Sequence, residues 1–228
     1  MSCALANNRG WFPNNESGRL LSFGSFPAGL YLPTADMDLV YTSDTHYHGG
    51  PPLFTVDTDR AKIKSSLHKA ARKLQSAGIA IRPTVIAQAK VPIIKFQDRK
   101  TRLDVDISFE NLSGVQAQGT FNEWKNKYPD MPFLVALVKQ VLVMRDLNEV
   151  HTGGLGGYSI ICLIMNYLQR EGQADNLGGC FLDFLEYYGK KFDLRRKRIQ
   201  MRPPWVVDKV SRQNPQHNRI CEDHANGS

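Results

Sequence analysis

Short apolar runs, bounded by Gly, Pro and polar residues, recur along the first half of the chain. Runs of this length predict strands, and we place them at residues 20–23, 39–42, 84–88, 91–96 and 103–109. Between the second and third runs, apolar residues recur with the helical period at Ile63, Leu67, Ala70, Ala71 and Leu74. They predict one amphipathic helix over residues 60–76.

The pattern changes after Gly114, where the strand-like runs give way to longer stretches with helical periodicity. Four helices are predicted, over residues 121–127, 132–145, 155–169 and 177–188. The chain is therefore predicted to be α+β, with a small mixed sheet and helices followed by an all-helical region. We expect an irregular segment at 1–19, a first domain at 20–115, a helical domain at 116–203 and a polar tail at 204–228.

Most of the formal net charge of +7 lies in one segment of the 228-residue chain. Residues 190–202 hold seven Lys or Arg residues against a single acid, Asp193. Such a run is either a solvated basic face or a contact for a polyanion such as RNA, and the sequence leaves both open.

The four cysteines form no C-x-x-C pair, so we expect neither a structural zinc site nor a disulfide framework. This usage is typical of a reducing intracellular compartment. The sequence shows no secretory signal and no apolar stretch of transmembrane length, so we expect no membrane partner.

Carboxylates gather at two of the predicted strands. Asp36 and Asp38 stand two residues apart, and strand geometry directs such side chains to one side. Close carboxylates repel unless a cation compensates them, and oxygen-rich sites select hard ions such as Mg²⁺. A third carboxylate from a later strand allows two metal ions about 3.5–4 Å apart, as in-line phosphoryl transfer uses. Strand alternation alone leaves open whether Asp106 or Asp104 supplies it.

Gly24 and Ser25 follow the first predicted strand and precede a turn. A glycine lets the backbone approach phosphate oxygens, and the serine hydroxyl and nearby N–H groups donate to them. Each signal is weak alone, but this order beside the carboxylates predicts a nucleotide site.

Long segments of the chain resemble a known family. Residues 23–40 resemble the palm motif of polymerase-beta-like nucleotidyltransferases, and residues 89–96 with 106–110 resemble the strand pair that bears the third carboxylate. Residues 147–159 resemble the helical-domain signature. Over residues 20–192, these motifs together resemble the nuclear surveillance poly(A) polymerases, the catalytic subunits of TRAMP-type complexes.

The resemblance implies a nucleotidyltransferase palm at 20–115, an incomplete helical domain related to the PAP-associated type at 116–203, and roles for single residues. The implied catalytic metal ligands are Asp36, Asp38 and Asp106. The implied ATP contacts are Gly24, Ser25 and Lys139 at the triphosphate, and Gly157 and Tyr158 at the base. From the residues alone, the alternatives are that Lys139 is a solvated helical lysine and that Tyr158 is a core aromatic.

The activity implied by the resemblance is template-independent addition of AMP to RNA 3′ ends, with ATP as substrate and Mg²⁺ or Mn²⁺ as cofactor. The implied setting is RNA surveillance and processing in the nucleus, in the nucleolus or nucleoplasm. The implied partners are the RNA 3′ end, an RNA helicase and a zinc-knuckle RNA-binding protein.

Two departures from the family pattern leave alternatives open. Residues 1–19 do not resemble the helix that precedes the Gly-Ser segment in the family, and the base-reading loop is not visible after Lys209. We therefore expect a truncated chain. The alternatives are a catalytically impaired remnant that binds RNA or a partner, and a terminal uridylyltransferase.

Overall fold

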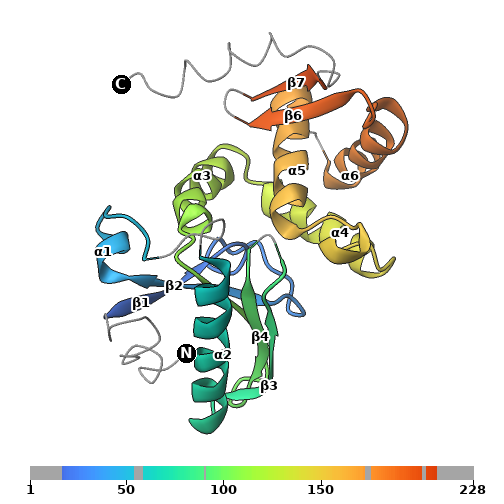
Figure 1. Cartoon of the computed structure of the whole chain (residues 1–228). Helices are drawn as coiled ribbons and strands as arrows, with labels where there is room; N and C mark the ends of the chain where they lie inside the picture. The colour runs from blue at the N-terminus through green and yellow to red at the C-terminus, as the bar shows by residue number, and fades with distance from the viewer. Residues whose placement is uncertain (1–16, 54–58, 90, 173–175, 202–203, 210–228) are drawn as a thin grey trace.

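The computed structural model describes residues 17–53, 59–89, 91–172, 176–201 and 204–209 (Figure 1). Most of the expected irregular start and most of the expected polar tail, residues 1–16 and 210–228, lie outside these ranges. The predicted α+β class is confirmed: a five-stranded mixed sheet comes first in the chain, and a helical region follows it.

The sheet contains every strand that the apolar runs predict. Its strands are β1 (Gly18–Phe23), β2 (Met37–Ser43), β3 (Ala80–Ile86), β4 (Ile93–Asp98) and β5 (Asp104–Phe109). The spatial order is β1-β2-β5-β4-β3, with β2 and β5 parallel and all other neighbours antiparallel. The parallel pair lies in the middle of the sheet, so both of its strands have neighbours on each side.

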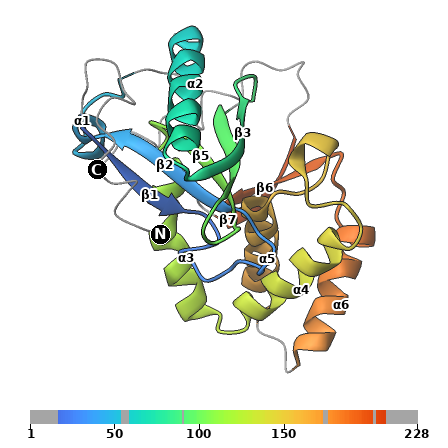
Figure 2. The ribbon, with the colours of Figure 1, turned by 90° about the horizontal axis from the view of Figure 1, so that it is seen from below.

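One face of the sheet is covered by α2 (Arg60–Ser76), whose bounds match the prediction, while α1 (Asp44–Tyr47) is a short helix after β2 (Figure 2). Ile63, Leu67 and Leu74 of α2 pack on alternate residues of the central strands, among them Leu39 and Ile107, in one buried core. Because strand side chains alternate, the residues between these core positions face away from α2. Both Asp38 and Asp106 are such residues.

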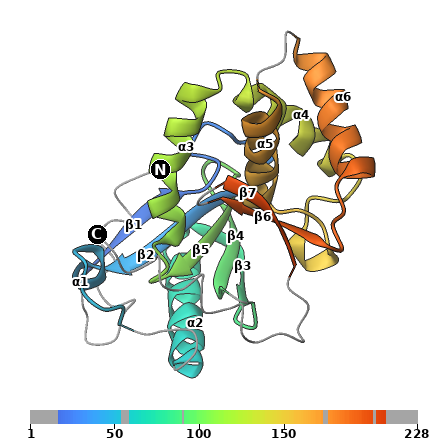
Figure 3. The ribbon, with the colours of Figure 1, turned by 90° about the horizontal axis from the view of Figure 1, so that it is seen from above.

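The second half of the chain forms the helical region on the opposite side of the sheet from α2 (Figure 3). It comprises α3 (Ser113–Lys127), α4 (Met131–Val143), α5 (Gly157–Glu171) and α6 (Leu177–Glu186), with a 3₁₀ turn η2 (Val150–Thr152) and a π turn η3 (Tyr187–Lys191). None of the described helices is long and apolar enough to cross a membrane.

Two features of this region differ from the predicted pattern. Helix α3 begins at Ser113 rather than at residue 121, because two glycines and several polar residues in its first half hide the helical period. A hairpin, β6 (Lys197–Met201) with β7 (Pro204–Asp208), follows the helices and was not predicted. Its first strand is rich in basic residues and lacks the apolar run by which a strand is recognised.

A loop from the sheet enters the core of the helical region. Ala28 and Leu30, which follow β1, are buried in a cluster with residues of α3, α4, α5 and α6. Backbone hydrogen bonds from Gly29 N–H to the Phe26 carbonyl and from Leu30 N–H to the Ser25 carbonyl fold the loop tightly. The loop therefore links the two cores of the molecule.

Candidate active site

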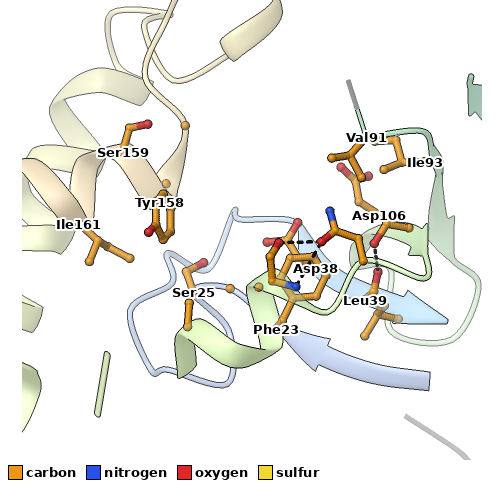
Figure 4. Close-up of a pocket in the computed structure, with 18 of the residues that line it drawn as sticks. Phe23, Ser25, Asp38, Leu39, Val91, Ile93, Asp106, Tyr158, Ser159 and Ile161 are labelled. Carbon is orange, nitrogen blue, oxygen red and sulfur yellow. Dashed lines mark hydrogen bonds between the residues drawn. The ribbon is translucent and has the colours of Figure 1, made fainter. Parts of the chain in front are cut away.

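A cleft of about 740 Å³ lies between the sheet and the helical region (Figure 4). Six of the eight predicted site residues line it: Gly24, Ser25, Asp38, Asp106, Gly157 and Tyr158. Asp38 and Asp106 belong to the sheet side, which we call the palm wall, and Tyr158 faces them from the helical wall. Residues that are up to 134 positions apart in the chain thus share one cavity.

The parallel pairing of β2 and β5 brings the carboxylates together. Asp38 is the register partner of Asp106, and Asp36 lies just before β2 begins. Asp104 is paired instead with Gln97 of β4 and is exposed. Strand alternation left both aspartates open, whereas the strand register makes Asp106 the direct neighbour of Asp38.

Burial and mutual repulsion disfavour the charged forms of these carboxyl groups. Desolvation, followed by the charge of Asp36, raises the pKa of Asp38 to about 6. Desolvation raises the pKa of Asp106 to about 7; the Lys95 charge opposes this shift, while the charges of Asp36 and Asp38 add to it. A bound cation would therefore stabilise the charged forms of these carboxyl groups.

Lys95 of β4 supplies positive charge to this cluster. It is the antiparallel register partner of Asp106, and its Nζ lies 2.5 Å from Asp36 Oδ2 and 3.9 Å from Asp106 Oδ1. No motif in the sequence had indicated a role for Lys95. Lys95 and Asp106 lie on two strands that the sequence predicted, but their proximity depends on the register between those strands.

The turn after β1 lies directly against Asp38. Gly24 has a φ of +76°, and a methyl group added there would lie 2.6 Å from Asp38 Oδ2. Its carbonyl accepts a hydrogen bond from the Gln118 side chain of α3 at 3.0 Å. Only a residue without a side chain fits between this turn and the carboxylate, which explains the Gly before Ser25.

Lys139 lies behind the cleft rather than on its surface. It is only 7% exposed, and its Nζ donates a hydrogen bond to the Leu30 carbonyl at 2.6 Å. A methyl group at Gly157, which lines the cleft, would lie 3.5 Å from this Nζ. Desolvation lowers the pKa of Lys139 to about 8, against the opposing effect of Asp38. The solvated-lysine alternative is therefore wrong.

Tyr158 presents its ring to the cleft from the first turn of α5. It is 61% exposed, so it is not a core aromatic, and its ring centroid lies 6.0 Å from that of Phe121. Figure 4 places Tyr158 opposite the carboxylates, with Ser25 near the floor between them. An exposed ring in this position can stack on a planar base.

Comparison with known proteins assigns the chain to a family. Residues 5–125, more than half of the chain, match the model of "Poly(A) RNA polymerase, mitochondrial-like, central palm domain". The chain belongs to this poly(A) RNA polymerase family. A second model, "Cid1 family poly A polymerase", matches residues 176–223 and so extends into the segment expected to be a tail.

Individual relatives and a solved structure agree with this family. Poly(A) RNA polymerase protein 1 of Saccharomyces cerevisiae is 39% identical over 178 residues, which are 75% of this chain and 26% of that protein. Poly(A) RNA polymerase cid14 of Schizosaccharomyces pombe is 40% identical over 181 residues, or 76% and 25% of the two chains. The chain thus spans about a quarter of the length of these curated relatives.

The solved structure described as the "polymerase core of TRAMP, a RNA surveillance complex" superposes with a TM-score of 0.69 at 34% identity. The match covers 87% of this chain and 62% of that chain. Nucleotidyltransferases of this family generally use ATP and a divalent metal.

The palm wall of this family member has the chemistry to hold a divalent ion. Asp106 Oδ1 is buried and accepts no hydrogen bond within the described part of the chain. No hydrogen-bond donor of the described residues uses its lone pairs, and a cation here would offset the burial and repulsion that raise the pKa values of Asp38 and Asp106. In the described residues, however, no three His, Cys, Asp or Glu side chains are already arranged around a common metal position.

Proposed function

We propose that this chain is the catalytic part of a template-independent RNA 3′-end adenylyltransferase. The observation that carries the proposal is the placement of Asp38 and Asp106 as direct strand partners in a cleft, with Tyr158 exposed on the opposite wall. Membership of the poly(A) RNA polymerase family supports ATP as the substrate. The 3′-hydroxyl loses its proton to solvent and its oxygen bonds to the α-phosphorus of ATP. The bond between that phosphorus and the oxygen bridging to the β-phosphate breaks, and pyrophosphate leaves.

The palm wall would hold the reacting phosphates. Asp36, Asp38 and Asp106 are the proposed ligands of Mg²⁺ or Mn²⁺, which would supply Lewis-acid activation of the 3′-hydroxyl and neutralise charge on the triphosphate. The turn at Gly24 and Ser25 approaches this position without a side chain in the way. Its N–H groups and the Ser25 hydroxyl would donate hydrogen bonds to phosphate oxygens.

The helical wall would hold the nucleoside. Tyr158 would stack on the base, which provides affinity for any base rather than selection among bases. Lys139 would contribute a buried positive charge behind Gly157, within reach of the triphosphate side of the cleft. Its ammonium donates one hydrogen bond to the Leu30 carbonyl, which leaves two of its three N–H groups to donate to phosphate oxygens.

The finer biological setting follows the relatives. The likeness to the polymerase core of TRAMP, an RNA surveillance complex, supports a role in RNA surveillance. The proposed nuclear setting, and the proposed RNA helicase and zinc-knuckle partners, rest on the family resemblance of the sequence motifs. The exposed basic residues Arg195, Arg196, Lys197 and Arg198 would add to the contact with the RNA backbone.

A primer-extension assay tests this function. Purified chain is incubated with an unstructured labelled RNA, Mg²⁺ and each nucleoside triphosphate separately, with Asp36→Ala beside the wild type. Extension with ATP that the variant loses is the expected result. Extension with UTP alone would identify a terminal uridylyltransferase. The contrary result is a folded chain that extends the RNA with none of the four triphosphates, even after a helicase and a zinc-knuckle partner are added. In that case the impaired-remnant hypothesis replaces this one.

A further inference from the structure

The ammonium of Lys95 contacts two of the three carboxylates proposed to bind metal. Its Nζ is 2.5 Å from Asp36 Oδ2, a charge-assisted hydrogen bond, and 3.9 Å from Asp106 Oδ1. Asp36 precedes β2 and Asp106 lies in β5, so one side chain from β4 connects three chain segments. The contact follows from the sheet register, which pairs Lys95 with Asp106 and Asp106 with Asp38.

This contact and a bound metal ion compete for the same oxygen atoms. An ammonium group only donates hydrogen bonds and cannot be a metal ligand, so an ion that binds at Asp36 Oδ2 competes with it for the lone pairs of that oxygen. The positive charges of the ammonium and the metal ion would also repel each other if both contacted Asp36. Among the described residues, no three-carboxylate group is already arranged for a metal.

Lys95 also has a route out of the cluster. Its side chain is 41% exposed, whereas that of Asp106 is 18% exposed. Rotation about the long side chain can therefore move the ammonium into solvent while the carboxylates stay in place. The charge of Glu149, on the loop between α4 and α5 in the helical region, also acts on Lys95.

We propose that Lys95 is a tethered counter-ion that holds Asp36 and Asp106 together in the metal-free chain and is displaced when a divalent ion binds. It is a positioning residue, because it acts on the reaction through the carboxylates. Because an incoming ion must displace the Lys95 ammonium, the affinity of the site for free metal is lowered. Filling of the site therefore depends on metal that arrives with the nucleoside triphosphate. This inference rests on the proposed function, which assigns the metal to the three aspartates.

Metal binding without any reaction tests the inference. Binding of Mn²⁺ alone is measured by electron paramagnetic resonance for wild type, Lys95→Met and Lys95→Arg. We expect Lys95→Met to bind Mn²⁺ at least about tenfold more tightly than wild type, about 1.4 kcal/mol. Lys95→Arg keeps the charge and should bind like wild type. Lys62→Met, which removes a lysine paired with Asp59 on α2, is the matched control and should leave the affinity unchanged.

The outcomes separate this inference from the proposed function. If wild type binds Mn²⁺, Asp106→Asn does not, and Lys95→Met binds no more tightly than wild type, the counter-ion role is overturned while the metal site stands. If neither wild type nor Lys95→Met binds Mn²⁺, both proposals fail. The counter-ion role is supported if Lys95→Met binds Mn²⁺ more tightly than wild type and Lys95→Arg binds it with wild-type affinity. A change in packing alone would not be corrected by restoring the positive charge.

A second measurement uses the wild-type chain and does not depend on any variant. The rate at which an amine-reactive reagent modifies Lys95 is followed by mass spectrometry, with modification of Lys62 as the internal reference. Saturating Mn²⁺ should raise the rate at Lys95 relative to Lys62, because the ammonium leaves Asp36. A ratio that Mn²⁺ does not raise would overturn the proposal.

Discussion

The two walls of the cleft are positioned by different kinds of structure. On the palm wall, Asp38, Asp106 and Lys95 are successive partners across β2, β5 and β4, so backbone hydrogen bonds fix their spacing. On the helical wall, Tyr158 and Gly157 begin α5, whose placement depends on side-chain packing with α4. A slip of one residue in a strand would turn every carboxylate to the other face, whereas a packed helix adjusts gradually. The palm wall should therefore tolerate less change.

The loop that follows β1 couples these two walls. Ala28 and Leu30 are buried in the core of the helical region, and their carbonyls accept hydrogen bonds from Lys125 of α3 and Lys139 of α4. The same loop begins with Gly24, which lies against Asp38. A shift of the helices would thus be transmitted to the carboxylates through backbone atoms of a few residues.

The largest expected effect compares one glycine from each wall. A side chain at Gly24 would lie 2.6 Å from Asp38 Oδ2 in a backbone conformation with φ of +76°, whereas one at Gly157 would make an ordinary 3.5 Å contact with Lys139. We expect Gly24→Ala to lower kcat/KM for ATP by about 100-fold or more, since misplacement of about 1 Å has that effect. Gly157→Ala should change it by only about threefold.

Single-turnover extension of a labelled RNA measures both variants, and circular dichroism confirms that each is folded. Equal losses in the two variants would contradict the difference between the walls. A near-normal rate for Gly24→Ala would also show that the site does not need a glycine between this turn and Asp38.

A second comparison places one glycine against the palm and one in solvent, both on α3. A methyl group at Gly114 would lie 2.2 Å from the Phe23 ring, whereas nothing lies within 4 Å of one at Gly119. We expect Gly114→Ala to lower the free energy of unfolding by about 2 kcal/mol through overpacking. Gly119→Ala should raise it by about 0.5–1 kcal/mol through helix propensity. Urea denaturation measures both, and the same sign for both variants would show that α3 does not pack tightly on Phe23.

Local sequence patterns predicted the helices and strands that have a long periodic pattern or clear turn residues at their ends. The 17 residues of α2 were placed to the residue, because five apolar side chains repeat with one period and a glycine follows. The strands were found with shifts of up to four residues, as at β3, where Pro83 and a bulge interrupt the apolar run. A pattern of this kind reports the burial of one element at a time.

Contacts between distant residues were beyond that signal. The choice of Asp106 over Asp104 and the role of Lys95 both depend on which strands are neighbours. Lys139 lies on the buried face of α4 with Val135 and Val138, but no local pattern could show the partner of its ammonium, the Leu30 carbonyl, 109 positions earlier in the chain. Six of the eight site residues line one cleft; strand alternation and turn chemistry indicated Gly24, Ser25 and Asp38, whereas Asp106, Gly157 and Tyr158 were chosen by family resemblance.

The smallest expected effect compares a charged cap in the palm with a neutral cap in the helical region. Asp98 ends β4 and accepts hydrogen bonds from the Thr101 N–H at 2.7 Å and hydroxyl at 2.8 Å, and from the Lys100 N–H at 3.2 Å. Asn176 caps α6 by accepting from the Gly179 N–H at 2.6 Å. Replacing either by Ala should lower the free energy of unfolding by about 1 kcal/mol at neutral pH.

The two caps should differ in their response to acid. Burial alone would raise the pKa of Asp98, but the hydrogen bonds from Thr101 and Lys100 outweigh it and lower the pKa below its ordinary 3.8. A lowered folded-state pKa adds stability that is present above 3.8 and is lost as the pH falls through the folded-state value. Urea denaturation from about pH 6 to about pH 3 should therefore show the Asp98→Ala difference shrinking, while the Asn176→Ala difference stays constant because amides do not titrate. A constant difference for Asp98→Ala would mean that hydrogen bonds to its neutral form hold the turn equally well, and the palm would then owe its rigidity to strand pairing without help from this charge.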